Sequence, residues 1–219
     1  MIKSIEKTDK KLKFITDMKI DLANAIRRSV LEIPVMAIDD VEIIKNDSAL
    51  YDENIAHRIG LIPIKTEKTS KETKFKLKEK GPKTVYSSDL SPKNDTEMSI
   101  PIVILGKGQE VEIICNAKLG EGVEHVKYSP GLVFYKHNLD SGVLDFVHVD
   151  KEGNITYDEE ELKNKKISEE QIKKIKDAKD AKELEFNIES LGQLDTKDIF
   201  SKSIEVLESN LKELDKAVK

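Results

Sequence analysis

The sequence predicts an α+β protein made of short strands and two amphipathic helices, the second of which is long. Three observations predict this fold class. The first 45 residues read as strand, strand, helix and strand, short apolar segments separated by Gly, Pro and Ser turns follow to about residue 148, and a helical repeat occupies residues 196–218. The chain of 219 residues is long enough for one large domain or two small ones.

The N-terminal elements are predicted from a change in hydrophobic period. Residues 2–7 and 11–16 are short strand-like segments separated by a polar turn. A helix is expected over residues 21–33, because its apolar residues recur at spacings of four, four and three: Leu22, Ile26, Val30 and Ile33. Pro34 prevents the helix from continuing, and a strand pattern returns over residues 35–45.

The character of the chain changes after Asn46. Short apolar segments alternate there with turn residues, which predicts a mostly β region with strands at residues 59–64, 75–77, 100–105, 111–117 and 132–135. Residues 150–182 are dense in charge and nearly free of large apolar side chains. That segment is either a solvated helix or disordered, and its pattern does not decide between the two.

The last helix carries the most informative pattern. It follows a strand at residues 184–188 and a turn near Gly192. Six of its apolar side chains recur with the 3.5-residue period of a helix–helix seam: Phe200, Ile204, Leu207, Leu211, Leu214 and Val218. Burying all six would contribute on the order of 10 kcal/mol, as an upper bound.

The rest of the sequence holds no helix of comparable length to cover this seam. We therefore expect a second chain to cover it, which is either a different partner or, in a homodimeric interaction module, another copy of the same protein. The alternative is that the seam packs wholly on the local sheet.

Composition excludes several classes of function. A formal net charge of −5 and a pI near 5.6 argue against a stand-alone nucleic-acid-binding protein. Charged residues make up 36% of the chain, above the roughly 25% typical of globular domains, which favours an elongated or partner-dependent protein over a compact enzyme. The only cysteine, Cys115, excludes an internal disulfide and a thiolate-based metal site within the chain. Without a signal-peptide pattern or an apolar run approaching ~20 residues, we expect a soluble, cytoplasmic protein.

Two groups of side chains are candidates for recognition or chemistry. Only three of the 37 basic residues are arginine, and the clustering of Arg27, Arg28 and Arg58 in two short segments favours partner recognition. On a helix, Glu53 and His57 would lie one turn apart, as the acid/base pair of a small hydrolase would. No nucleophile elbow or phosphate-binding loop accompanies them, so hydrolysis is the weaker alternative. The other three histidines are twelve and eleven residues apart, unlike the three to five of zinc-ligand pairs.

Several segments resemble those of a known family. Residues 24–31, with the sequence Asn-Ala-Ile-Arg-Arg-Ser-Val-Leu, and residues 37–41 are similar to the first helix and next strand of the alpha-like subunits of cellular RNA polymerases. Residues 50–64 resemble the second signature of that family, which is far more specific than an arginine pair. Further similarities follow in the family's order at residues 81–90, 124–131 and 186–194, so the resemblance spans most of the chain.

The resemblance implies an architecture. Alpha-like subunits have an α+β dimerisation domain, an antiparallel sheet with two helices, that is split by an inserted, mostly β domain. In this chain the dimerisation domain would be residues 1–46 and 183–219, and the insert residues 47–149. Residues 150–182 would be a charged segment in place of the cysteine-rich domain of some relatives. Because that segment contains no Cys, we expect no iron–sulfur cluster, no zinc and no other cofactor.

The resemblance also implies partners. Such subunits pair with a smaller alpha-like partner, subunit L in archaea, by packing their first and last helices together. The pair then assembles the two large catalytic subunits and the small subunits N and P. The family's subunit carries no part of the nucleotidyl-transfer site, so we expect a non-catalytic scaffold of DNA-directed RNA polymerase in transcription, without sequence-specific DNA binding and without a membrane.

Individual residues follow from the matched motifs. The positions that match large-subunit contacts are Asn24, Arg27, Arg28, Glu53, His57, Arg58 and Gly60. The heterodimer seam would combine the six apolar residues of the last helix with Leu22, Ile26 and Val30 of the first. No residue is expected to be catalytic.

Overall fold

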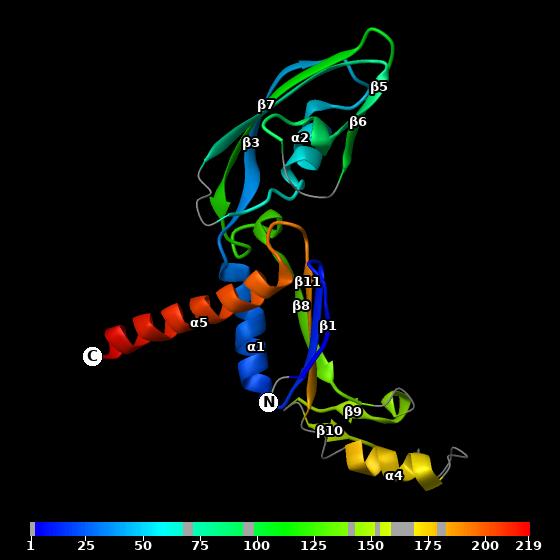
Figure 1. Ribbon diagram of the computed structural model, residues 1–219, viewed down its shortest axis with the longest axis vertical. Helices are drawn as coiled ribbons and strands as arrows, with labels where there is room; N and C mark the ends of the chain where they lie inside the picture. The colour runs from blue at the N-terminus through cyan, green and yellow to red at the C-terminus, as the bar shows by residue number, and fades with distance from the viewer. Residues whose placement is uncertain are drawn as a thin grey trace.

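The computed structural model describes residues 3–67, 72–93, 99–139, 143–151, 154–158, 169–178 and 183–219. Two hydrophobic cores dominate these residues and lie one above the other in Figure 1. We call the cluster around Phe186 the first core and the cluster around Ile113 the second core. None of the helices within these ranges is long and apolar enough to span a membrane.

The first core lies against a four-stranded antiparallel sheet. Its strand order is β1–β2–β11–β8, so strands from the two ends of the chain pair at its centre. The strands are β1 Lys3–Lys7, β2 Lys11–Thr16, β8 Gly131–His137 and β11 Leu184–Ser190. Phe14 of β2 and Phe186 of β11 are direct cross-strand partners, and their rings stack with centroids 5.3 Å apart.

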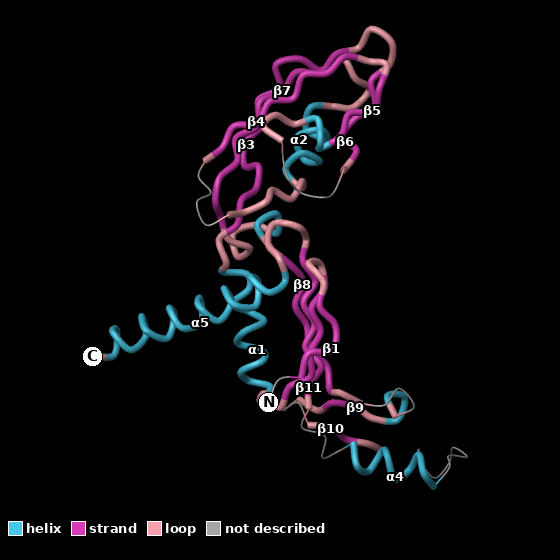
Figure 2. Tube along the Cα trace, in the orientation of Figure 1, coloured by secondary structure: helices cyan, strands magenta, loops and turns pink. Residues whose placement is uncertain are grey.

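Two helices cover the inner face of this sheet, on the same side in Figure 2. Helix α1 (Ile20–Ser29) continues into the 3₁₀ turn η1 (Val30–Glu32), and the long helix α5 is Thr196–Val218. The Phe200 ring of α5 lies edge-on to Phe14 at 5.3 Å and to Phe186 at 6.2 Å. The N-terminal half of α5 is therefore anchored in the first core.

The second core lies between a three-stranded antiparallel sheet and helix α2 (Asp52–Gly60). The strand order is β3–β7–β4, with bounds β3 Val35–Asn46, β4 Thr73–Lys80 and β7 Glu110–Gly120. Strands β5 (Lys83–Tyr86) and β6 (Pro101–Leu105) form a separate antiparallel pair, and α2 lies between this pair and the larger sheet (Figure 1). Two 3₁₀ turns complete the region, η2 Ser87–Asp89 and η3 Val126–Tyr128.

A small third cluster lies below the first sheet in Figure 1. Its elements are η4 Leu144–Phe146, β9 His148–Val149, β10 Ile155–Thr156 and α4 Glu169–Ala178. Val143 and Ile175 are buried there, with Leu139, Phe146, Val147 and Tyr157 packed beside them. The charged region thus contains a helix that one isoleucine, Ile175, anchors. Residues 152–153, 159–168 and 179–182 of that region lie outside the described residues.

The predicted α+β class with antiparallel sheets is confirmed, but residues 59–64 do not form the predicted strand. They begin in the last turn of α2 and continue as an irregular segment. Ile55, Ile59 and Ile62 are all buried and recur at spacings of four and three. The spacing of four places Ile55 and Ile59 on the buried face of α2, and Ile62 is buried two residues beyond the end of the helix.

The boundary between the two cores differs from the predicted ranges. Strand β8 falls within the expected insert at residues 47–149 but pairs with β11 in the first sheet. Strand β3, expected with the first unit, pairs with β7 in the second sheet. The physical reason is that the start of β3 lies between the two cores, since Val35 and Ala37 on one face pack in the first core while Met36 and Ile38 on the other face pack in the second.

Cys115 is fully buried in β7, and its burial raises the pKa of the thiol to about 12. Because the thiolate is the reactive form, we expect no modification by Ellman's reagent in the folded protein at pH 8, and modification of one thiol per chain after unfolding in urea. Rapid labelling of the native chain at one thiol per molecule would contradict this burial.

Candidate partner-binding surfaces

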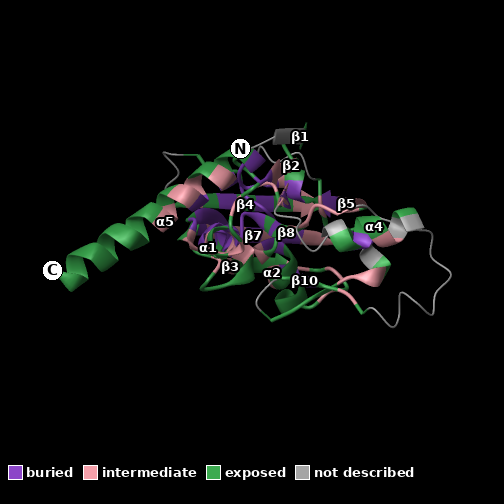
Figure 3. Ribbon diagram, turned by 90° about the horizontal axis from the view of Figure 1, so that it is seen from below, coloured by how far each residue is buried: buried purple, intermediate pink, exposed green. Residues whose placement is uncertain are grey.

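The two halves of α5 differ in how they contact the rest of the chain. In the first half, Ile199 and Ser203 are buried against the first core, and Phe200, Ile204 and Leu207 are half-buried beside them. In the second half, Leu211, Leu214 and Val218 are 57%, 60% and 79% exposed. Figures 1 and 3 show this half projecting away from the rest of the molecule. The N-terminal part of the predicted seam therefore packs on the protein's own core, and its C-terminal part is exposed to solvent.

The part of the predicted seam on α1 is wrong for two of its three residues. Leu22 is 48% exposed, but Ile26 and Val30 are 4% and 2% exposed and belong to the first core. Their side chains are not accessible to another chain. The spacing of four residues marks an apolar face of the helix, and it does not tell a face that packs inside the chain from one that packs on a partner.

The polar face of α1 carries the first group of predicted contact residues. Asn24 and Arg27 lie one turn apart, and Arg27 Nε and Nη2 donate hydrogen bonds of 3.1 and 2.8 Å to Asn24 Oδ1. Arg28 is exposed on the neighbouring position. The amide of Asn24 therefore holds the Arg27 guanidinium in place and reduces the freedom that it would lose on binding.

The second group lies on α2, in the other core (Figure 1). Glu53 and His57 are exposed, whereas Arg58 Nη1 donates a 2.6 Å hydrogen bond to the Ile102 carbonyl of β6. Arg58 thus also ties α2 to the β5–β6 pair. A Cβ at Gly60 would meet the Ile38 carbonyl at 3.9 Å, an ordinary contact, so local packing does not require glycine there.

The acid/base interpretation of Glu53 and His57 gains no support from their surroundings. In the described part of the chain, no hydrogen bond or ion pair joins the two side chains, and both face solvent. The His125 ring is used structurally, since its Nδ1 accepts the Lys127 amide at 3.1 Å and caps η3. Among the described residues, no group of three or more His, Cys, Asp or Glu side chains is arranged as a metal site.

One charged cluster that sequence reasoning missed lies where the two cores meet. Asp39 of β3 accepts hydrogen bonds from Lys118 Nζ at 2.8 Å, Lys127 Nζ at 2.9 Å and the Tyr128 hydroxyl at 3.0 Å. The hydrogen bonds from Lys118 and Lys127 hold the pKa of Asp39 well below its ordinary value. Lys127 and Tyr128 lie 88 and 89 residues from Asp39 in the sequence, so only the fold brings them together.

Asp39→Asn is expected to lower the melting temperature at pH 7 by about 2–4 °C. That is the shift that ~1 kcal/mol produces in a chain of this size, and solvent screening of the partly exposed carboxylate limits the loss to this order. The folded pKa of Asp39 is lowered, so its contribution is present above the ordinary value of 3.8 and is lost as the pH falls towards the folded pKa.

The difference in melting temperature between parent and variant should therefore be largest near neutral pH and should decrease progressively below about pH 4. Thermal denaturation followed by circular dichroism measures it. Asp40→Asn is the matched control, because it removes the same charge from a carboxylate whose partner is the Asn116 amide. A gap for Asp39→Asn that stays constant from pH 7 to pH 3 would contradict the ionic origin of the stabilisation.

Comparisons with known proteins relate most of the chain to one family. The family model of the RNA polymerase Rpb3/Rpb11 dimerisation domain matches residues 14–211. The DNA-directed RNA polymerase subunit Rpo3 of Methanocaldococcus jannaschii is 44% identical over 153 residues, which are 67% of this chain and 80% of that protein. Rpo3 of Pyrococcus horikoshii is 39% identical over 170 residues, 70% of this chain and 63% of its own length.

A eukaryotic protein is also similar. The DNA-directed RNA polymerase II subunit rpb3 of Dictyostelium discoideum is 36% identical over 161 residues, 58% of this chain and 53% of that protein. The chain spans only 61% to 65% of the length of the Rpo3 relatives from two Pyrococcus species and Thermococcus kodakarensis.

Proposed function

The chain belongs to the family of the RNA polymerase Rpb3/Rpb11 dimerisation domain, and on that premise we propose that it is a non-catalytic assembly subunit of a DNA-directed RNA polymerase. It takes the place of archaeal Rpo3, the equivalent of the third-largest subunit of eukaryotic RNA polymerase II. It pairs with the smaller alpha-like subunit L, and the pair is the platform on which the two large subunits and subunits N and P assemble.

The exposed second half of α5 is the observation that carries this proposal. Leu211, Leu214 and Val218 continue the 3.5-residue period of the half-buried residues before them, on a helix that projects from the body. A contiguous apolar strip left in solvent marks an interaction site. A strip this narrow fits a helix of another chain better than a flat sheet surface, since the 3.5-residue period is the geometry of helix–helix seams.

The seam on this chain comprises Leu22 at the side of α1 and the α5 residues from Phe200 to Val218. In the proposed complex the buried Ile26 and Val30 support this surface from below and do not contact subunit L. The first core then corresponds to the dimerisation domain and the second core to the domain inserted into it.

The polar surfaces are assigned to the large subunits. Asn24, Arg27 and Arg28 form one contact region on α1, and Glu53, His57 and Arg58 form the other on α2. The two regions lie on different cores, so a large subunit that touches both spans the junction between them. We propose further that the chain acts in the cytoplasm, needs no metal or other cofactor, and does not bind DNA sequence-specifically.

Mixing the purified chain with subunit L tests the proposal. We expect a 1:1 complex by size-exclusion chromatography with light scattering, and co-purification of the large subunits with the tagged chain from its native cell. A stable homodimer that ignores subunit L would support the interaction-module alternative and contradict the proposal.

His57→Ala distinguishes the proposal from the small-hydrolase alternative. Because His57 is exposed and lies on α2, away from α5, the variant should pair with subunit L with unchanged affinity. A hydrolase that depended on Glu53 and His57 would instead lose its activity with this single substitution. A loss of pairing in His57→Ala would contradict the assignment of the seam to α5.

A further inference from the structure

One group of contacts between the two cores involves a single turn, residues 191–195, which leads directly into α5. Gly192 within it has a φ of +113°, a conformation that favours glycine, and its Cα faces Pro63, so that a Cβ would lie 3.6 Å from that ring. The Gly192 amide donates to Ser190 Oγ at 3.0 Å. The positive φ of Gly192 and its hydrogen bond to Ser190 thus define the shape of the turn without any contribution from the second core.

Thr66, which follows α2 in the chain, joins this turn to the start of β3. Its amide donates to the Gln193 carbonyl at 2.8 Å, and its hydroxyl accepts the Met36 amide at 2.9 Å and donates to the Ile64 carbonyl at 3.3 Å. Thr66 is 6% exposed, so these bonds are shielded from water. The Thr66 amide therefore bonds to the turn that leads into α5, while the Thr66 hydroxyl holds this residue on Met36 and Ile64 of the second core.

Gln193 connects the same turn to the segment before β8. Its Nε2 donates to the carbonyls of Lys127 and Ser129 at 3.4 and 3.3 Å, and the residue is 3% exposed. Three residues later the chain enters α5, where the Thr196 hydroxyl donates to the Thr8 carbonyl at 3.0 Å. The first turn of α5 is thus fixed on the β1–β2 turn of the first sheet, while Gln193, three residues before α5, is bonded to Thr66.

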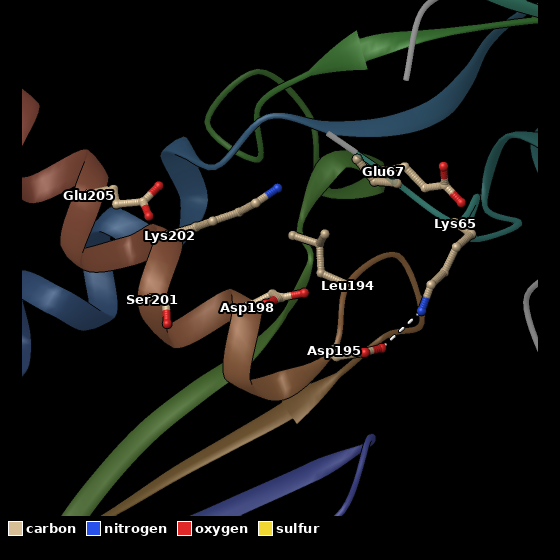
Figure 4. A pocket seen from close by; sticks show the side chains of 9 residues that line it. Lys65, Glu67, Leu194, Asp195, Asp198, Ser201, Lys202 and Glu205 are labelled. Carbon is tan, nitrogen blue, oxygen red and sulfur yellow. Dashed lines mark hydrogen bonds and ion pairs between the residues drawn. The ribbon is translucent and has the colours of Figure 1, made fainter. Parts of the chain in front are cut away.

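A surface contact lies above these buried bonds. Lys65 Nζ pairs with Asp195 Oδ1 at 2.9 Å, and both residues line a groove of about 470 Å³ between residues 65–67 and the first turns of α5 (Figure 4). Both partners are partly exposed, so this pair adds little rigidity on its own. The buried hydrogen bonds of Thr66 and Gln193 are the stronger constraint.

We propose that Thr66 and Gln193 are positioning residues that set the angle between α5 and the second core. Through them, the apolar edge of α5 and the exposed face of α2 are held in one relative orientation. Two cores joined only by the segments of chain that run between them would be expected to move relative to each other. The inference concerns the isolated chain and does not depend on which partners bind the two surfaces.

Distances between spin labels on the two cores test this proposal in the full chain. Cysteines introduced at the exposed positions Asn54 of α2 and Ser209 of α5 accept the labels, while buried Cys115 does not react. Thr66→Val keeps the shape and the amide that donates to Gln193, but it removes the hydroxyl that holds residue 66 on Met36 and Ile64 of the second core, so the segment that carries the amide is no longer fixed there. We expect pulsed electron paramagnetic resonance to show an Asn54–Ser209 distance distribution at least twice as broad as in the parent.

Two controls separate positioning from general stability. Thr66→Ser keeps the hydroxyl and should restore the parent distribution, and a label pair within the second core, at Asn54 and Lys107, should be unaffected by Thr66→Val. Gln193→Met, which removes the Nε2 donor, should reproduce the broadening if Thr66→Val does not fold. An unchanged Asn54–Ser209 distribution in the folded variants, or equal broadening of both label pairs, would overturn the proposal.

Discussion

Replacing Leu211 with aspartate is expected to abolish pairing with subunit L without unfolding the chain. Leu211 is 57% exposed in the isolated protein, so its own fold loses little. In the complex the leucine would be buried, and the aspartate would bring an unpaired carboxylate into an apolar seam. The lost burial and the desolvation together amount to at least ~3 kcal/mol, or more than about 100-fold in Kd. Isothermal titration calorimetry measures the loss.

Ser209→Asp is the matched control for this substitution. It introduces the same charge two residues earlier, on the opposite face of α5, at a position that is exposed. It should pair with near-parent affinity, and both variants should keep the parent melting temperature. Normal pairing of Leu211→Asp would mean that the exposed edge of α5 does not face subunit L.

Phe186→Ala is expected to lower the free energy of unfolding of the first core by about 3–5 kcal/mol, the usual cost of removing a buried aromatic ring. Phe186 is fully buried, and its ring contacts those of Phe14, Phe200 and Tyr135 with centroids 5.3, 6.2 and 6.5 Å away. Removing it leaves a cavity between β11 and α5. Urea denaturation followed by circular dichroism measures the effect.

Phe134→Ala provides the comparison. Phe134 lies on β8, opposite Asn187 of β11, and is 39% exposed on the outer face of the same sheet. Its removal should cost less than about 1.5 kcal/mol, because most of the ring is already in contact with solvent. Equal losses for the two variants would contradict the position of the first core on the inner face of the sheet.

The elements that sequence reasoning predicted best are those with long, uninterrupted periods. The predicted bounds of the last helix, residues 196–218, are those of α5, because its repeat runs through six turns without a breaker. α2 was missed because Ile59, Leu61, Ile62 and Ile64 also fit a short apolar strand, and a nine-residue helix offers too few repeats to decide. A local hydrophobic pattern does not distinguish a helix from a strand where the segment is short.

The candidate surfaces show a second limit of prediction from the sequence. The exposed edge of α5 was predictable because it is a property of one helix, and so was the neighbourhood of Asn24 and Arg27, one turn apart. The burial of Ile26 and Val30, and the bonds of Thr66 to Met36 and Gln193, depend on residues 30 to more than 100 positions away. No local pattern in one sequence specifies such pairings.

The order of strands in the first sheet has a consequence for biosynthesis. The second core uses residues 36–117, a continuous stretch, so it can fold on the ribosome as soon as that stretch emerges. In the first sheet, β2 has β1 and β11 as its neighbours, and β11 is synthesised after all strands of the second core. The N-terminal hairpin and α1 must therefore wait for residue 190 before their apolar faces are covered. The first core, on which the N-terminal half of α5 packs, is therefore completed later in synthesis than the second core.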